Sequence, residues 1–283
     1  MTPEMPYAEV IGDPIGHSKS PLIHKFWLEK LGLEGEYRAT KVTPDELGGY
    51  FASRRDDPLW RGCNITMPLK LAALAHVAKP QDPSFPVEPV NLAVPLNGRV
   101  IGLNTDIHGV MEPLAPLLTN EGMLRPSSAP ASRNAVVLGA GGALYPVVWS
   151  LLSLGYKAIT LVARDRAKVA TYLGQRNSVT IRYLAWGDPL PPSDLLVNAT
   201  PLGMTGYPDL PYDASSIAGD GVVFELVYRP LETTLLRDAR QRRLQIVDGL
   251  QMLVGQAAPS FARFFGKAAP RDFDSELRAL LTQ

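Results

Sequence analysis

The sequence predicts a two-domain α/β protein whose sheets are mostly parallel. Short apolar segments with the pattern of strands alternate with segments of helical periodicity, which is typical of βαβ units. The 283 residues exceed an average domain of about 150 residues, so two domains are expected. A glycine cluster at 139–143 stands between an apolar strand and a helix, as in the first turn of a doubly wound sheet.

The first third of the chain reads as repeated strand and helix segments. Strands are predicted at Tyr7–Gly12, Glu36–Val42 and Gly62–Thr66. Helices are predicted at Pro21–Leu31, where apolar residues recur at helical intervals before Gly32, and from Pro44 to Arg55. This order predicts an open, mostly parallel sheet.

An antiparallel hairpin is predicted next. The segments Val90–Pro95 and Arg99–Gly102 flank Asn97-Gly98, the dipeptide that best tolerates two positive φ angles in a tight turn. A helix is then predicted from Asp106 to about Leu118. Asn120–Asn134 is rich in Pro, Ser and Ala, and we interpret it as a surface connection near a domain boundary.

The second half predicts a Rossmann-type, doubly wound domain. The strand Ala135–Leu138 enters the glycine cluster, a helix runs through Leu154, and a second apolar strand follows at Ala158–Val162. Further elements are predicted as strands at about 180–183, 194–198, 222–226 and 244–247, and as a closing helix at about 252–265.

Composition and charge restrict the partners. Hydrophobic residues make up 46% of the chain and charged residues 20%, which argues against disorder and fibrous repeats. The 28 basic and 28 acidic residues cancel, so no net charge draws the chain toward nucleic acid or an anionic membrane. We therefore expect a small-molecule partner, with no nucleic acid and no membrane.

Cysteine usage and the N-terminal sequence indicate a cytoplasmic protein. The single Cys63 excludes an intrachain disulfide and a cysteine-rich zinc site, and we predict that it is a small buried residue. The first residues carry Glu4 and two prolines instead of a basic start and an apolar segment, and no stretch holds about 18 unbroken apolar residues.

The glycine cluster has the context of a dinucleotide site. Glycines in this turn let the backbone approach a pyrophosphate held at the helix N-terminus. Leu144 stands where a small residue is expected, and its bulk could push the helix away from the strand. A plain glycine-rich turn is the alternative interpretation.

The residues after the second Rossmann strand bear on the choice of cofactor. Arg164, with Arg166 and Lys168 nearby, suits the extra phosphate of NADP. Asp165 would repel that phosphate and could instead accept a hydrogen bond from the free ribose of NAD. These residues leave both NADP and NAD possible, and a solvated charged turn is the alternative interpretation.

Polar side chains in the first half follow strand ends, where open α/β sheets bind small ligands. Ser18 and Ser20 stand beside a helix start, and on spacing alone we expect Ser20 to cap that helix. Lys70 follows a strand and a proline turn, and Asp106 follows the hairpin. Together, an amine and a carboxylate could move a proton to or from an alcohol, although each alone is more often a surface charge.

Taken together, these motifs resemble the shikimate dehydrogenase family, and they match it in order over nearly the whole chain. The matching segments are 11–21, 64–70, Asn91, 102–106, 139–143, 198–204, 227–230 and 248–256.

The resemblance implies a reversible NADP-dependent hydride transfer between 3-dehydroshikimate and shikimate, in the pathway to chorismate and the aromatic amino acids. It implies a substrate-binding catalytic domain at 1–108, completed by 249–283, and an NADP-binding Rossmann domain at 109–248. We expect a monomer or a homodimer.

The resemblance also implies a role for individual residues. Lys70 is expected to be the catalytic acid and base, paired with Asp106. The expected substrate-binding residues are Ser18, Ser20, Thr66, Lys70, Asn91, Asp106 and Gln256, with Tyr228 near the carboxylate. The expected cofactor-binding residues are Gly139, Ala140, Gly141, Gly142 and Ala143 for the pyrophosphate, Arg164 for the adenosine phosphate, and Leu226 and Gly249 on the nicotinamide side.

Departures from the family pattern keep two alternatives open. Ala163-Arg164-Asp165 replaces the usual Asn-Arg-Thr, and Leu144 replaces a small residue. The alternatives are an NAD-preferring quinate/shikimate dehydrogenase and a non-catalytic shikimate-binding member. Two other classes of enzyme are poorly supported. The sequence around Ser18 lacks the second glycine of the serine hydrolase motif, and the four histidines lack the spacing of a metal enzyme's ligands.

Overall fold

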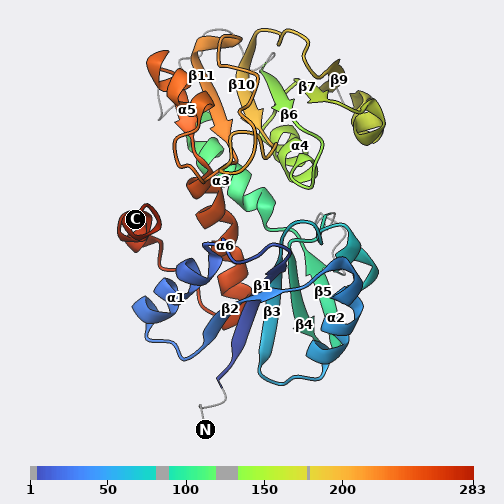
Figure 1. Cartoon of the computed structure of the whole chain (residues 1–283), viewed down its shortest axis with the longest axis vertical. Helices are drawn as coiled ribbons and strands as arrows, with labels where there is room; N and C mark the ends of the chain where they lie inside the picture. Colours follow the sequence, from blue (N-terminus) through green and yellow to red (C-terminus); the bar gives the residue numbers. More distant parts are fainter. Residues whose placement is uncertain (1–4, 81–88, 119–132, 177–178) are drawn as a thin grey trace. The chain divides into compact units, whose positions relative to one another are not determined.

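The computed structural model of the chain describes residues 5–80, 89–118, 133–176 and 179–283 (Figure 1). These residues divide into two units, Met1–His108 with Leu253–Gln283, and Gly109–Met252. Each unit contains one sheet. The predicted connection at 120–134 lies almost wholly outside the described residues.

The first unit is built on a five-stranded sheet in the order β2-β1-β3-β4-β5. Its strands are β1 (Tyr7–Gly12), β2 (Glu36–Lys41), β3 (Trp60–Ile65), β4 (Leu92–Leu96) and β5 (Arg99–Leu103). Strands β1, β2 and β3 are parallel, and β4 and β5 are antiparallel additions. The associated helices are α1 (Ser20–Leu31), η1 (Pro44–Glu46), α2 (Leu47–Arg55), η2 (Ala72–Ala75), α6 (Gly249–Phe265), η4 (Arg271–Phe273) and α7 (Asp274–Leu281).

Helices cover both faces of this sheet, which explains why every residue of β1 is buried. Tyr7 and Ile11 pack in one core cluster with Phe51 of α2. Ala8 and Val10 point to the opposite face and pack in a second cluster that includes Phe264 of α6. The alternation along one strand therefore separates the two cores.

The predicted hairpin is confirmed. Asn97 and Gly98 join β4 to β5 with φ angles of 52° and 72°. Positive φ at both positions is what a two-residue turn of this kind requires. The predicted helix from Pro44 is interrupted, because Thr43 and Glu46 form a capping box over the short η1 before α2 begins.

The second unit is built on a seven-stranded sheet in the order β12-β11-β10-β6-β7-β9-β8, and only β8 is antiparallel to its neighbour. The strands are β6 (Asn134–Leu138), β7 (Ala158–Ala163), β8 (Gly174–Arg176), β9 (Val179–Ala185), β10 (Ser193–Asn198), β11 (Ile217–Glu225) and β12 (Gln245–Val247). The helices are α3 (Asp106–Leu118), α4 (Leu144–Ser153), η3 (Arg166–Tyr172) and α5 (Thr234–Gln241). The predicted doubly wound α/β class is confirmed.

The strand order locates a topological switch. From β6 the chain adds β7 and β9 on one side, and it then returns to add β10, β11 and β12 on the other. The carboxyl ends of β6 and β10 are therefore where an open α/β sheet is expected to bind a ligand.

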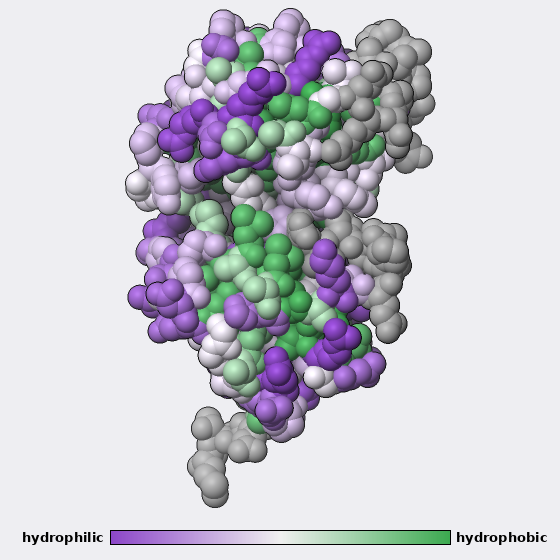
Figure 2. Space-filling view, turned by 90° about the vertical axis from the view of Figure 1, so that its right-hand side faces the viewer, coloured by the Kyte–Doolittle hydropathy of each residue, from purple (hydrophilic) through white to green (hydrophobic). Residues whose placement is uncertain are grey.

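The face drawn in Figure 2 carries a hydrophobic area among hydrophilic residues. The most exposed large hydrophobic side chains of the described residues include Leu71, Met67 and Leu96, all in the first unit.

Cys63 is buried, as predicted. Within the described part of the chain, no helix has the length and apolar character needed to cross a membrane.

His24 of α1 is a fully buried histidine. Its ring is stacked on Tyr37 with the centroids 3.9 Å apart, and among the described residues neither ring nitrogen has a hydrogen-bond partner. Burial lowers the pKa of His24 from 6.5 to about 3. The folded protein therefore keeps this imidazole neutral at pH values where the unfolded chain protonates it.

This difference predicts a pH-dependent stability that His24→Phe removes. Above pH 6.5 the imidazole is neutral in both the folded and the unfolded protein. Below pH 6.5 the unfolded chain binds a proton that the folded protein does not, so the free energy of unfolding decreases by up to about 1.4 kcal/mol per pH unit. Between pH ~7.5 and ~5, the wild-type free energy of unfolding should fall about 2 kcal/mol more than that of the variant. Urea unfolding at both pH values measures this, and an equal decrease in both proteins would contradict it.

Candidate active site

Lys70 and Asp106 form an ion pair in the first unit. Lys70 lies in the turn that follows β3, and Asp106 begins α3 directly after the β4–β5 hairpin. The backbone carbonyl of Lys70 accepts a hydrogen bond from Val90 N–H at 3.1 Å, which ties the turn to the hairpin. The side chains are 18% and 6% exposed, so the pair is largely shielded from water.

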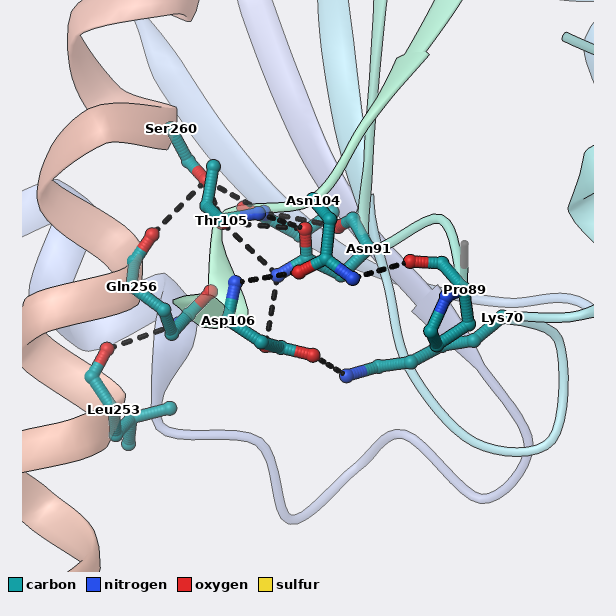
Figure 3. A network of polar contacts seen from close by, with 10 residues as sticks. Lys70, Pro89, Asn91, Asn104, Thr105, Asp106, Leu253, Gln256 and Ser260 are labelled. Carbon is teal, nitrogen blue, oxygen red and sulfur yellow. Dashed lines mark hydrogen bonds and ion pairs between the residues drawn. The ribbon is translucent and has the colours of Figure 1, made fainter. Parts of the chain in front are cut away.

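Asn91 holds the second oxygen of the Asp106 carboxylate. Its Nδ2 donates to Asp106 Oδ1 at 2.8 Å, while Lys70 Nζ donates to Oδ2 (Figure 3). The Asn91 Oδ1 accepts a hydrogen bond from Thr105 N–H at 2.6 Å. The Asp106 N–H donates to Asn104 Oδ1 at 2.9 Å. The carboxylate is therefore fixed from both sides and through its own backbone.

Helix α6 contributes to the same network. Ser260 Oγ accepts a hydrogen bond from Asn64 Nδ2 at 2.9 Å and lies 3.1 Å from Thr105 Oγ1. Ser260 also donates to the carbonyl of Gln256, whose own Nε2 donates to Leu253 O (Figure 3). Sequence reasoning did not select Asn64, Thr105 or Ser260. The first two lie inside the matching motifs, but no sequence signal marks Ser260.

Three predicted hydroxyl residues lie at the carboxyl ends of the neighbouring parallel strands β1 and β3. Ser18 follows β1 and Thr66 follows β3, where Thr66 N–H donates to Ile11 O at 3.0 Å. The expectation that Ser20 caps α1 is wrong. Ser20 is the first helical residue, no side chain caps the helix, and the Ser18 hydroxyl oxygen accepts from Ser20 N–H at 3.2 Å.

The first unit thus combines one amine with several hydroxyl and amide groups. An amine held by a carboxylate can exchange a proton with an alcohol or carbonyl oxygen. Amide and hydroxyl groups can orient the other oxygens of a polyhydroxylated ring. In the residues that the structure describes, no group of three or more His, Cys, Asp or Glu side chains is placed to hold a metal ion.

The second unit contains a cavity of about 470 Å³ at the predicted switch point. Its lining comes from the segments that follow four parallel strands. The lining residues are Gly139, Ala140 and Gly141 after β6, Ala163, Arg164, Asp165 and Lys168 around the end of β7, Trp186 after β9, and Ala199, Thr200, Pro201, Leu202, Tyr207 and Pro208 after β10.

The glycine turn approaches the segment after β10 so closely that Gly139 tolerates no side chain. Its φ angle is 106°, and an added Cβ would lie 2.8 Å from Thr200 Cγ2. Gly142 and Ala143 continue the turn but do not line the cavity. Leu144 is buried in the core with Val147 of the same helix, so its bulk packs against the sheet and not at the turn.

Arg164 and Lys168 place two exposed cations on the cavity wall. Asp165 lies between them and has a structural contact, since its Oδ1 accepts a hydrogen bond from Ala167 N–H at 2.9 Å and caps η3. The cap explains a carboxylate at this position without requiring a ribose partner.

Sequence reasoning did not select Trp186, Thr200 or Tyr207 as lining residues. Thr200 lies in a matching motif, and Trp186 follows a strand end, but nothing in the sequence marks Tyr207. Leu226 and Tyr228 follow β11 in the second unit. Gly249 packs against the backbone of Leu226 and Val227, because an added Cβ there would lie 2.7 Å and 2.5 Å from their carbonyl oxygens. Leu226, Tyr228 and Gly249 do not line the cavity.

Comparison with known proteins identifies the family of this chain. Residues 10–92 match the model of the shikimate dehydrogenase substrate binding domain, and residues 249–273 match that of the shikimate 5'-dehydrogenase C-terminal domain. Shikimate dehydrogenase (NADP(+)) of Sphingopyxis alaskensis is 46% identical over 281 residues, covering 98% of this chain and 97% of its own.

Two solved structures extend the comparison. Shikimate 5-dehydrogenase from Thermus thermophilus, in complex with NADP(H) and shikimate, is 32% identical with a TM-score of 0.80, covering 98% of this chain and 100% of its own. Ligand-free 5-ketofructose reductase of a Gluconobacter strain is 25% identical with a TM-score of 0.81 and covers 98% of each chain. Because the full-length sequence similarity accompanies the matching motifs, the chain belongs to the shikimate dehydrogenase family.

Proposed function

We propose that this chain catalyses the reversible, NADP-dependent interconversion of 3-dehydroshikimate and shikimate. The observation that carries the proposal is the Lys70–Asp106 pair with Asn91 on the second carboxylate oxygen. The family relationship identifies the substrate, since relatives of this chain are NADP-dependent shikimate dehydrogenases.

Lys70 acts as the general base when shikimate is oxidised. As the neutral amine it takes the proton of the reacting hydroxyl while hydride leaves the same carbon, and as the ammonium ion that pairs with Asp106 it returns that proton in the reduction. Asp106 holds the amine in place through the ion pair, and Asn91 holds Asp106. Ser18, Ser20, Thr66, Gln256 and Tyr228 orient the remaining oxygens of the substrate.

The cavity of the second unit fits NADP. Gly139, Ala140 and Gly141 line it with little side-chain bulk, which suits the approach of a pyrophosphate to the backbone, and Arg164 and Lys168 suit the adenosine phosphate. When bound, NADP supplies the hydride acceptor. We assign substrate binding to 1–108 with 249–283 and NADP binding to 109–248, and we expect a cytoplasmic monomer or homodimer.

Initial rates of nicotinamide reduction with shikimate, measured in parallel with NADP and NAD, test the proposal. Faster turnover with NADP at equal concentrations is expected. A preference for NAD would favour a quinate/shikimate dehydrogenase, with quinate as the second substrate to assay. Shikimate binding without turnover on either cofactor would favour a non-catalytic family member.

Arg164→Ala should separate the two cofactors. Charge-assisted hydrogen bonds contribute about 1.5–3 kcal/mol, so the KM for NADP should rise about tenfold or more. The KM for NAD, which lacks the phosphate, should change by less than about threefold. Arg166→Ala is the matched control, because Arg166 lies in the same segment but does not line the cavity. Equal effects on NADP and NAD would contradict this role of Arg164.

A further inference from the structure

Glu225 is a buried acid that accepts hydrogen bonds from three separate segments. It is the last residue of β11 and is 0% exposed. Asn198 Nδ2 lies 2.9 and 3.1 Å from its two carboxylate oxygens, Val227 N–H donates at 2.9 Å, and the Thr233 hydroxyl donates at 3.0 Å. Burial raises the pKa of Glu225 to about 7, and these hydrogen bonds oppose the rise because they favour the ionised form.

The carboxylate and the segment after β10 together fix which way the Asn198 amide points. Asn198 ends β10 and pairs directly with Glu225 across the parallel strands. Every hydrogen bond to the Glu225 oxygens comes from a donor, so the Asn198 NH₂ group faces Glu225, and the same Nδ2 also donates to Leu202 O at 3.1 Å. Its Oδ1 then faces the other way and accepts from Thr200 N–H at 3.1 Å and from the Thr200 hydroxyl at 2.7 Å.

Thr200 connects Asn198 to the wall of the cavity. Its Oγ1 accepts a hydrogen bond from Leu202 N–H at 3.1 Å, which closes the segment 199–202, here called the β10 loop. All four residues of the β10 loop line the cavity. Thr200 Cγ2 also packs on the glycine turn, where a Cβ on Gly139 would be only 2.8 Å away. A shift of the β10 loop would therefore change the spacing between two walls of the cavity.

We propose that Glu225 is a positioning residue for the cofactor site, which holds the β10 loop in its binding conformation through the amide of Asn198. The assignment of the ligand rests on the proposed function. Glu225 itself does not line the cavity. It also receives the hydroxyl of Thr233, the N-cap of α5, so one carboxylate connects β10, β11 and α5.

Two substitutions distinguish acceptor chemistry from packing. Glu225→Gln keeps the shape but replaces one acceptor oxygen by an NH₂ group, so Asn198 Nδ2 loses one of its two carboxylate acceptors. Glu225→Asp shortens the side chain but keeps an acceptor-only group. If packing alone mattered, Gln would be the milder change; if Glu225 orients Asn198, Asp is the milder change. Val223→Ala, in the same strand and also fully buried, is the control for lost stability.

The readouts are the dissociation constant of adenosine 2′,5′-bisphosphate, the KM for NADP, and hydrogen–deuterium exchange of the β10 loop, with thermal unfolding alongside. Glu225→Gln is expected to weaken bisphosphate binding and raise the KM for NADP about tenfold, about 1.4 kcal/mol. Exchange in the β10 loop should increase, and Glu225→Asp should lie between Glu225→Gln and wild type. Val223→Ala should leave binding and loop exchange within about twofold at a similar loss of melting temperature.

Several outcomes would overturn the proposal. One is a milder effect of Gln than of Asp, and another is the same rise in KM and loop exchange in Val223→Ala. Failure of the proposed function can be distinguished from failure of the role of Glu225, because bisphosphate binding and hydrogen–deuterium exchange of the β10 loop require no turnover of shikimate. If the wild type does not bind the bisphosphate, the proposed function fails, and the order of the variants in loop exchange still decides the role of Glu225.

Discussion

Replacing Lys70 by alanine is expected to lower kcat for shikimate oxidation by about 10²–10⁴-fold, the usual contribution of a general acid or base. The substitution removes the amine that Asp106 holds, and the pair is shielded enough that water is a poor substitute. The melting temperature should fall somewhat, because Asp106 is 6% exposed and keeps only the hydrogen bond from Asn91 on its carboxylate when its cation is removed. Steady-state kinetics with saturating NADP and shikimate measure the effect.

Lys25→Ala is the matched control for this prediction. Lys25 lies in the same unit, its side chain is 75% exposed, and its contact with Glu29 is a surface pair. Its kcat should equal that of the wild type. A Lys70→Ala variant that turns over at a near-normal rate would reject Lys70 as the acid and base.

Arg54→Ala is expected to destabilise the protein by about 3–5 kcal/mol, because it leaves a buried carboxylate without its cation. The carboxylate is Glu9 of β1, which is 1% exposed. Arg54 donates to it from Nε at 2.8 Å and from Nη2 at 3.1 Å, and Thr40 and Tyr50 donate their hydroxyl groups. The free energy of unfolding from denaturant titration measures the loss.

The pH dependence of this loss has a defined sign. Burial alone would raise the pKa of Glu9, but the hydrogen bonds from Arg54, Thr40 and Tyr50 outweigh it, and the pKa lies below 4.5. The corresponding stability is present above pH 4.5 and is lost as the pH falls through the folded pKa. Wild type and variant should therefore differ less at acidic pH, where Glu9 is protonated in both.

Arg55→Ala controls for the loss of a positive charge from the same helix. Arg55 is exposed, so its removal should change stability by less than about 0.5 kcal/mol. A similar effect of both substitutions, or a gap that does not narrow at acidic pH, would contradict the buried-pair interpretation.

Local sequence signals were sufficient where they specify backbone conformation. The predicted strand Tyr7–Gly12 matches β1 residue for residue, because prolines and glycine interrupt the apolar run at both ends. Asn97-Gly98 defined the hairpin for a similar reason, since few other residues accept positive φ at both turn positions. The strand–glycine–helix order likewise predicted the βαβ unit of the second sheet.

Three short elements, α5, α7 and β8, were not predicted because their sequences carry little periodicity. Helices α5 and α7 have eight residues each, and β8 has three. Their stability depends on packing against the rest of the unit, as Leu235 and Leu236 of α5 do in the core of the second sheet. The prediction that Ser20 caps α1 was wrong for a related reason. The spacing identified the start of a helix but could not distinguish the hydroxyl groups of Ser18 and Ser20.

The sequence by itself determined the fold class, the strand ends that carry ligand groups and, through the family motifs, the residues to examine. Only the tertiary structure decided which of them meet. Lys70 and Asp106 are 36 residues apart in the chain, and their contact depends on the hairpin returning beside β3. Ser260 of α6 contacts Thr105, the neighbour of Asp106, and Glu225 contacts Asn198 because β10 and β11 are neighbours. The physical reason is that hydrogen bonds and ion pairs act over a few ångströms, whereas the order of strands in a sheet is set by burial of the whole chain.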